Sequence, residues 1–250
     1  TALKKEHAKE YDRIIRKTGL TDGEIKYWEI VQDKMYLPRK EGTSLLEQFE
    51  GYFKLDDVVI EKYDENDWPI RPEALKTKKA RQTQIIKQAD VVMLLHLMGE
   101  EFSEDEISQN YEYYEKRTLH GSSLSPSIYS VMGLKVGDDS KAYRYLKRAA
   151  FLDLLNLQKN TREGIHAANT GGVWQTVVFG FAGVSIGEDG MLTVCPHMPK
   201  EWEGLDFSLH YLNSWLKITI SRDNSVLVKV LDGETLEVKV NGQIIKASRE

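Results

Sequence analysis

Residues 118–127 read TLHGSSLSPS, and residues 164–174 read GIHAANTGGVW. In each stretch small hydroxyl or glycine residues stand beside a histidine, next to the predicted start of an apolar helix. The first backbone N–H groups of a helix have no partner within it, so hydroxyls and an imidazole beside them make a seat for an oxyanion such as phosphate. The segment between the two stretches can return the chain to the same end of a helical bundle. We therefore expect the two stretches to form one site.

Each stretch also has a simpler interpretation. A serine run before Pro126 is most often a helix N-cap, because the missing N–H of proline costs nothing in the first helical turn. Gly171 and Gly172 could equally mark a close contact between two helices. On residue chemistry alone the capping interpretation is the commoner one, and both remain open at this point.

The bulk composition excludes several classes of protein. A chain of 250 residues, 41% hydrophobic and 29% charged, is typical of a soluble globular protein with one large or two smaller domains. The net charge of −5 and the lack of a basic stripe argue against nucleic-acid binding. No apolar run is long enough to span a membrane, and residues 1–16 form a charged amphipathic stretch and not a signal peptide.

The remaining compositional signals concern metals, redox chemistry and length. The single Cys195 excludes an intrachain disulfide and suits a reducing cytoplasm. The histidines are scattered without metal-ligand spacing, so no metal site is expected. Because the chain begins with Thr1 and not with methionine, we expect it to be part of a longer protein.

The first three quarters of the chain predict helices joined by short turns. Capping boxes at Thr21–Glu24 and Ser103–Glu106 each open a helix. Residues 35–77 predict an extended loop with brief helical turns, and the apolar positions in 78–98 predict a helix buried on most sides. Further helices are expected at about 122–133, 138–157 and 169–181. Alternation of more and less buried helices is typical of stacked or circularly arranged helical hairpins.

Near Gly183 the hydrophobic period changes from that of helices to that of strands. Turn signals separate alternating segments at 191–194, 206–211, 215–220, 226–230 and 236–240. The pattern predicts a small antiparallel β-sheet or sandwich domain over 184–250 after a helical domain over 1–183. Trp202 and Trp215 could stack on a sugar ring, but packing against neighbouring elements is the commoner role of such aromatics.

Residues 33–38 (DKMYLP), 86–91 (IKQADV), 113–125 (YYEKRTLHGSSLS) and 163–168 (EGIHAA) resemble motifs of glycoside hydrolase family 65, which holds the inverting maltose, trehalose, kojibiose and nigerose phosphorylases. The resemblance runs through essentially the whole chain. It implies a mainly α fold with a C-terminal all-β module, namely the C-terminal half of an (α/α)6 barrel followed by a small β domain. Gly121 resembles the kojibiose-type members, whereas many maltose phosphorylases carry a glutamate there.

The resemblance also implies roles for individual residues. Lys87 and Gln88 match the pair that lines the site of the transferred glucosyl unit, where an ammonium and a carboxamide can hold several sugar hydroxyls. His120 is expected to support the site and not to touch a ligand. The residues that match the phosphate seat of the family are Ser122, Ser123, His166, Gly171 and Gly172. Asn169 and Thr170 depart from the serine and small or apolar residue that are usual in relatives.

In the family, phosphate attacks the anomeric carbon of an α-glucoside from the opposite face and yields β-glucose 1-phosphate. An inverting hydrolase needs one carboxylate as acid and another as base, and an ionised phosphate makes the base unnecessary. Inorganic phosphate is thus the expected co-substrate, and no cofactor is expected. The general-acid glutamate of relatives lies upstream of the matched region. No catalytic residue is therefore assigned within this chain, and Glu47, Glu115 and Glu163 are not taken as replacements.

The favoured hypothesis is the C-terminal portion of an inverting α-glucoside phosphorylase that acts with the upstream half of the same enzyme. Since family members are commonly homodimers, a homodimer is expected. A non-catalytic sugar- or phosphate-binding remnant and an α-glucoside hydrolase of the same family remain alternatives. A pure docking scaffold is least favoured, because it has no need of Lys87 and Gln88 beside a phosphate seat. The sequence does not fix the glycosidic linkage.

Overall fold

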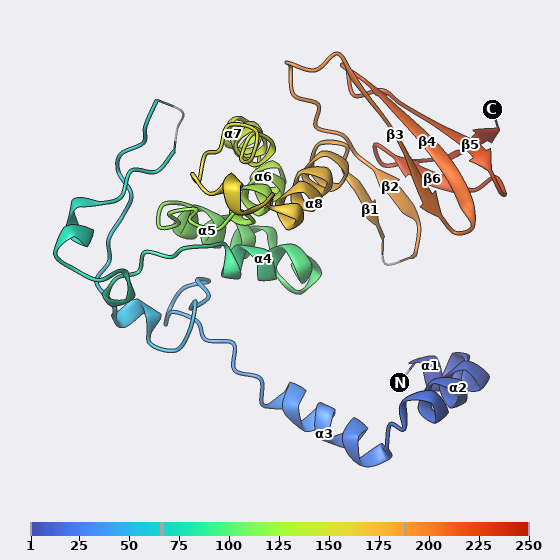
Figure 1. Cartoon of the computed structure of the whole chain (residues 1–250). Coiled ribbons are helices and arrows are strands. Elements are labelled where there is room, and N and C mark those ends of the chain that lie inside the picture. Colours follow the sequence, from blue (N-terminus) through green and yellow to red (C-terminus); the bar gives the residue numbers. More distant parts are fainter. Residues whose placement is uncertain (1, 66–67, 188, 250) are drawn as a thin grey trace. The chain divides into compact units, whose positions relative to one another are not determined.

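The computed structural model of the chain describes residues 2–65, 68–187 and 189–249 (Figure 1). Contacts divide the chain into unit 1, Thr1–Pro38, and unit 2, Arg39–Glu250. The helices of unit 1 are α1 (Ala2–Glu6), α2 (Ala8–Thr18) and α3 (Asp22–Asp33). The Thr21 hydroxyl accepts the Glu24 N–H, and the Glu24 carboxylate accepts the Thr21 N–H, so the predicted capping box before α3 is confirmed.

Unit 2 begins with loops and short helical turns and continues with a group of packed helices. The α-helices are α4 (Asp90–Leu97), α5 (Glu104–Glu115), α6 (Ser125–Lys135), α7 (Asp139–Ala150) and α8 (Ala167–Gln175), the last of which runs into the π-helical turn η6 (Thr176–Phe181). The 3-10 turns are η1 (Tyr52–Lys54), η2 (Glu73–Lys76), η3 (Ala80–Gln82), η4 (Gly99–Glu101) and η5 (Thr161–Glu163). The second predicted capping box, at Ser103 and Glu106, is confirmed at the start of α5.

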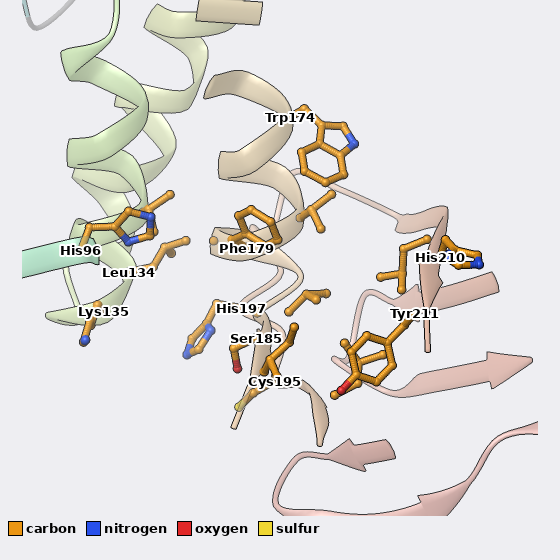
Figure 2. Close-up of a pocket in the computed structure, with 18 residues that line it drawn as sticks. His96, Leu134, Lys135, Trp174, Phe179, Ser185, Cys195, His197, His210 and Tyr211 are labelled. Carbon is orange, nitrogen blue, oxygen red and sulfur yellow. The ribbon is translucent and has the colours of Figure 1, made fainter. Parts of the chain in front are cut away.

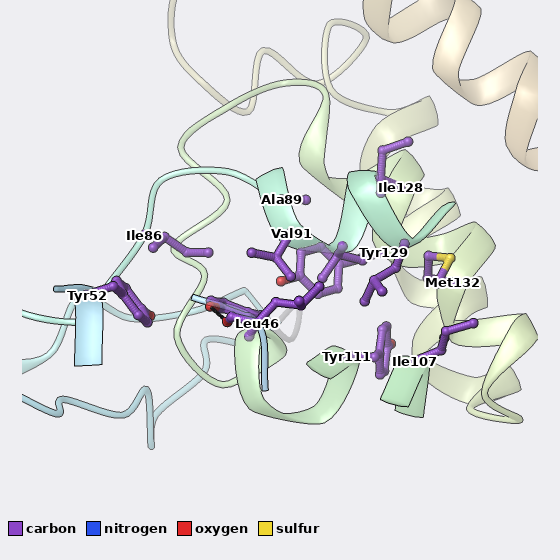
Figure 3. Packing of buried hydrophobic residues seen from close by; sticks show 13 residues of the cluster. Leu46, Tyr52, Ile86, Ala89, Val91, Ile107, Tyr111, Ile128, Tyr129 and Met132 are labelled. Atoms are coloured by element: carbon purple, nitrogen blue, oxygen red, sulfur yellow. Dashed lines mark hydrogen bonds between the residues drawn. The ribbon is translucent and has the colours of Figure 1, made fainter. Parts of the chain in front are cut away.

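Helix α6 is the centre of this helical part. It is buried from Ser125 to Leu134 and contacts α4, α5, α7, α8 and η6. Side chains of α4, α5 and α6 meet in one core, in which the rings of Tyr111 and Tyr129 lie 5.7 Å apart (Figure 3). A helix that is buried on all sides depends on neighbouring elements to cover each of its faces. The order of elements around α6 therefore fixes the positions of the loops at its N-terminal end.

The predicted helix over 78–98 is wrong for its first half, because only α4 (Asp90–Leu97) is α-helical. Residues 83–89 instead run extended: the Ile86 N–H donates to the Arg117 carbonyl, and the Ile86 carbonyl accepts the Leu119 N–H, both at 2.9 Å. Buried β-branched residues pack well in extended chain, and a short apolar run cannot by itself distinguish a buried strand from a buried helix.

Two other helices differ from prediction at their ends. The helix predicted over 122–133 begins at Ser125, because the preceding serines form a turn. The helix predicted over 138–157 ends at Ala150. The chain beyond it forms turns in which Asn156 and Lys159 have positive φ, a conformation that a right-handed helix cannot contain.

The β part of unit 2 forms two sheets. The strands are β1 (Val184–Ile186), β2 (Leu192–Val194), β3 (Gly204–Tyr211), β4 (Ser214–Ser221), β5 (Val226–Asp232), β6 (Glu237–Val240), β7 (Gln243–Lys246) and β8 (Ser248–Arg249). Their order is β1-β2-β6-β7 in one sheet and β3-β4-β5-β8 in the other. The predicted segments all form strands, and the order of a helical part followed by a β module is confirmed; β1, β7 and β8 were not predicted.

The predicted antiparallel character of the β part is confirmed, and two strand pairs are parallel. Strands β2 and β6 are parallel, as are β5 and β8. The chain leaves the first sheet after β2, forms the β3–β4–β5 meander of the second sheet, and only then returns as β6. A strand that arrives by such a long connection can run parallel to its neighbour, whereas a tight hairpin cannot.

The helices and the sheets share a hydrophobic core at Gly183. Val178 and Ala182 of the helical part pack with buried residues of both sheets, and Trp202 packs on Phe181 with ring centroids 5.3 Å apart. Gly183 has φ +62°, and its carbonyl accepts the Cys195 N–H at 3.1 Å. A Cβ atom on Gly183 would overlap the Cys195 carbonyl. Only glycine allows the chain to turn there from helix into β1.

We expect Gly183→Ala to lower the free energy of unfolding by about 2–5 kcal/mol, because it adds a backbone overlap to the cost of a left-handed conformation. Gly190→Ala is the matched control: Gly190 has φ +72° but open space around it, so only the conformational cost of about 1–2 kcal/mol remains. Urea unfolding of both variants measures the difference. Equal losses would contradict the importance of the close approach at Gly183.

Candidate functional site

Backbone hydrogen bonds hold Lys87 against the serine loop, which we define as residues 118–123. The Leu119 N–H donates to the Ile86 carbonyl at 2.9 Å, and the Gly121 N–H donates to the Lys87 carbonyl at 3.0 Å. The side chain of Lys87 runs across Gly121, with Cγ only 3.2 Å from the place of a Cβ atom there. A larger residue at 121 would displace the lysine. The structure thus brings two of the predicted site segments, 87–88 and 122–123, side by side.

Gln88 is exposed and is oriented by Asp90 at the start of α4. Gln88 Nε2 donates to Asp90 Oδ1 at 2.8 Å, and Gln48 Nε2 donates to Asp90 Oδ2 at 2.5 Å. The carboxylate therefore holds two amides in fixed directions. Asp90 belongs to the motif at 86–91, but no role was predicted for it. Gln48 was not predicted because 40 residues of chain separate it from Gln88.

Ser122 and Ser123 lie partly buried directly before α6. Ser122 Oγ accepts the Leu124 N–H at 3.3 Å and so stabilises the turn before α6, but the N-cap residue is Leu124 and no side chain caps the helix. A hydroxyl that accepts one hydrogen bond still has its own hydrogen to donate. Ser122 can therefore stabilise the turn and bind an oxyanion at the same time.

Within the serine loop, the His120 side chain is buried, with only 2% of the residue's surface exposed. Its ring nitrogens both have partners, Ser125 Oγ at 2.9 Å from Nδ1 and Tyr145 Oη at 3.1 Å from Nε2. Ser125 Oγ in turn donates to the Ser122 carbonyl at 3.3 Å. Burial, with a smaller contribution from the positive charge of Arg148, lowers the pKa of His120 to about 3. The imidazole is therefore neutral, and it ties the serine loop to the core.

His166 stands immediately before α8 and is held by Asp153. The two Asp153 oxygens accept the His166 N–H at 2.7 Å and contact Nδ1 at 2.6 Å. These hydrogen bonds, with the nearby imidazole, lower the pKa of the Asp153 carboxyl. A carboxylate hydrogen-bonded to Nδ1 fixes the orientation of the ring. Asp153 was not predicted, because it lies in the turn that follows α7, where the sequence predicted helix.

Gly172 makes a close contact between α8 and α6. A Cβ atom on Gly172 would lie 2.5 Å from Ser127 Oγ and 3.0 Å from Ser127 Cβ, as in the helix-contact interpretation. The exposed Gly171 has open space around it. Gly180 lies in η6, which continues α8, and it packs against Leu134 near the C-terminal end of α6.

Since residues 127 and 134 of α6 lie beside 172 and 180 of α8 and η6, the two elements run parallel and begin at the same end. The serine loop and His166 therefore lie at the same end of the helical part. Within the residues that the structure describes, no hydrogen bond joins the serine loop to His166. The two segments share an end of the bundle, and a ligand would have to bridge them.

A separate cavity of about 690 Å³ lies between α6, η6 and the sheets (Figure 2). Trp174, Phe179 and Tyr211 line it together with aliphatic side chains. None of the predicted site residues borders this cavity, and no carboxylate is found among its described lining residues. The cavity is therefore separate from the predicted site.

The described part of the chain lacks two kinds of feature. No group of three or more His, Cys, Asp or Glu side chains there is arranged to hold a metal ion. Among the same residues, no helix has both the length and the apolar character needed to cross a bilayer.

Comparisons with known proteins identify the same family over most of the chain. Residues 1–175 match the family model described as the glycosyl hydrolase family 65 central catalytic domain, and residues 187–246 match that of the family's C-terminal domain. A kojibiose phosphorylase of Caldanaerobacter subterraneus subsp. tengcongensis is 47% identical over 96% of this chain and 31% of its own length. An alpha,alpha-trehalose phosphorylase of Thermoanaerobacter brockii is 34% identical over 94% of this chain and 30% of its own.

A solved structure of a protein described as a kojibiose phosphorylase from the human microbiome is similar to this chain with a TM-score of 0.78 and 32% identity. The similarity covers 95% of this chain and 31% of that protein. The chain thus spans a little under a third of the length of the relatives that it matches.

The glycine pair in α8 gives a direct test of the helix contact. We expect Gly172→Ala to lower the free energy of unfolding by about 1–3 kcal/mol, because it forces α8 away from Ser127. Gly171→Ala should raise it by up to about 1 kcal/mol, since alanine favours the helix and meets no neighbour. Thermal and urea unfolding measure both. Destabilisation of similar size in the two variants would argue against the contact.

The burial of His120 predicts a pH dependence of stability. Between its ordinary pKa of 6.5 and its folded pKa of about 3, the unfolded chain binds a proton that the folded chain does not. The free energy of unfolding should therefore decrease as the pH is lowered through this range, by at most about 1.4 kcal/mol per pH unit from this group. The variant His120→Asn should lose the part of the dependence of unfolding free energy on pH that comes from this imidazole. Urea unfolding at several pH values compares the slopes, and identical slopes would contradict a neutral buried imidazole.

Proposed function

Because the chain belongs to glycosyl hydrolase family 65, we propose that it is the C-terminal portion of an inverting α-glucoside phosphorylase. The whole enzyme would use inorganic phosphate to cleave an α-linked glucosyl disaccharide into β-glucose 1-phosphate and a free sugar. The names of the relatives, kojibiose and trehalose phosphorylases, support this class of reaction. The missing two thirds of their length would supply the general acid.

The observation that carries the proposal is the backbone pairing of Lys87 with Gly121. It brings the backbone of residues 87–88 next to the segment that carries Ser122 and Ser123, which supports a shared site for these four side chains. Lys87 and Gln88 would hold the hydroxyls of the transferred glucosyl unit. Hydrogen bonds from fixed donors are effective because little freedom is lost when the ligand binds.

The phosphate would sit at the common end of α6 and α8. Ser122 and Ser123 would donate from one side, and His166, oriented by Asp153, from the other. One phosphate oxygen attacks C1 of the glucosyl unit as the bond from C1 to the glycosidic oxygen breaks. The upstream acid protonates the departing oxygen, so atoms and charge balance without a base or a cofactor.

Three features of the whole enzyme belong to the same proposal. Gly121, which leaves room for Lys87, favours kojibiose among the possible disaccharides, since kojibiose-type members also carry glycine there. The exposed free Cys195 suits a reducing cytoplasm. The proposal of a homodimer rests only on the fact that family members are commonly homodimers.

The reaction is tested by the release of glucose 1-phosphate from kojibiose, trehalose, maltose and nigerose, with and without inorganic phosphate. The enzyme that contains this chain together with its upstream portion should give phosphate-dependent release, and the chain alone, shown to be folded, should give none. Release by the chain alone would place an acid within these 250 residues and contradict the division of the site. Phosphate-independent release of glucose by the whole enzyme would favour a hydrolase.

The phosphate seat is tested by the double variant Ser122→Ala, Ser123→Ala in the whole enzyme. A hydrogen bond to a charged group contributes roughly 1.5–3 kcal/mol, so the KM for phosphate should rise at least about tenfold while the KM for the disaccharide changes little. Ser140→Ala, an exposed serine of α7, is the control and should change neither. Equal losses for phosphate and sugar would contradict the assignment.

A further inference from the structure

The ring of His166 has a hydrogen-bond partner on each of its two nitrogens. On one side, Nδ1 lies 2.6 Å from Asp153 Oδ1, and the second oxygen of the same carboxylate accepts the His166 backbone N–H at 2.7 Å. On the other side, Nε2 lies 3.4 Å from the side-chain nitrogen of Asn160. The two contacts together determine which nitrogen of the ring carries its hydrogen.

Asp153 requires a hydrogen on Nδ1. The hydrogen bonds that its carboxyl accepts from the ring and the backbone of His166 lower the pKa of that carboxyl, so the group is ionised at neutral pH. An ionised carboxylate can only accept hydrogen bonds. The ring must therefore donate from Nδ1.

Asn160 requires that Nε2 carries no hydrogen. The nitrogen of a carboxamide can only donate, so Nε2 is the acceptor in this contact. Both neighbours therefore select the same neutral form of the imidazole, with its hydrogen on Nδ1. The contact of 3.4 Å to Asn160 is longer than an ordinary hydrogen bond, so a ligand can replace it at little cost. The His166 side chain is 20% exposed.

This form of the ring has a consequence for the phosphate seat. A donation from Nε2 to phosphate needs a hydrogen that the ring does not carry there before the ligand arrives. Near neutral pH inorganic phosphate keeps an acidic hydrogen and can bring it to this contact. Sulfate, a dianion of the same shape, has no hydrogen to bring.

We propose that Asp153 is a positioning residue that makes the seat selective for an anion with its own proton. Asp153 holds Nε2 of His166 as an acceptor, and a hydrogen of the phosphate completes the contact, after which the ring nitrogen and the phosphate oxygen share it. Sulfate would set a second acceptor against Nε2 and lose that hydrogen bond. The inference rests on the proposed function, since it takes the seat to hold phosphate, and extends it to the choice of anion.

The first test observes the ring directly, by nitrogen NMR of the chain with isotope-labelled histidine at about pH 8, above the ordinary imidazole pKa of about 6.5. The variant His166→Gln identifies the signals of His166. We expect a hydrogen on Nδ1 and none on Nε2. Asp153→Asn should move the hydrogen to Nε2, because asparagine has one acceptor oxygen, and when the backbone N–H keeps it the amide nitrogen faces Nδ1. The control is Asp232→Asn, an exposed position of β5, which should leave the signals unchanged.

The second test compares inorganic phosphate with sulfate by calorimetric titration of the chain at the same pH. Phosphate should bind at least about tenfold more tightly, which is the effect of one hydrogen bond to a charged group. Asp153→Asn should raise the affinity for sulfate several-fold and bring the ratio of the two affinities close to one, because Nε2 then donates to either anion. A purely structural role of Asp153 would instead weaken both anions alike.

The inference is overturned if His166 of the wild type carries its hydrogen on Nε2, or if sulfate binds as tightly as phosphate. Equal weakening of both anions by Asp153→Asn, or no saturable binding of phosphate, would overturn it as well. Thermal unfolding identifies a variant that has lost its fold, and the two wild-type measurements then still decide the question. Failure of the proposed function has a different readout, namely no phosphate-dependent release of glucose 1-phosphate by the whole enzyme.

Discussion

The structure around the candidate site depends on one backbone pairing, between residues 86–87 and 117–121. Three hydrogen bonds of 2.9–3.0 Å join these two segments. The first segment leads into α4 and the second leads into α6, so the pairing fixes the relative position of the two helix starts. The second segment is anchored in turn by Arg117, which donates two hydrogen bonds to Asp57 and lies over the ring of Tyr113. The exposed side chains of the candidate site are therefore carried by a backbone that many contacts support.

Beneath this pairing, a chain of buried polar groups connects two regions of the surface. It runs from Glu115 through Tyr145 and His120 to Ser125 and the carbonyl of Ser122. Each member has a partner on both sides, which is the condition under which buried polar groups do not destabilise a core. Two members of the network, Glu115 and Tyr145, also border a cavity of about 350 Å³.

How much the sequence could predict follows from the range of the interactions involved. Capping boxes and strand alternation are local, so the starts of α3 and α5 and the main strands were predicted. Residues 83–89 were assigned to a helix because their extended form depends on a partner more than 30 residues away. The same limit hid Asp153 and Gln48, whose partners are known only once the fold is known. The roles of Lys87 and the serines came from resemblance, since residue chemistry alone favoured an ordinary helix cap.

Three carboxylates of the described chain orient neighbouring donors. Both oxygens of Asp90 accept hydrogen bonds from amides, and both oxygens of Asp153 contact His166. Glu115 likewise has Tyr145 on one oxygen and Lys141 on the other. Each of these acids holds a neighbouring donor in a fixed direction. The Gln88 amide and the His166 ring are therefore oriented before any ligand binds, which lowers the entropy that binding would cost.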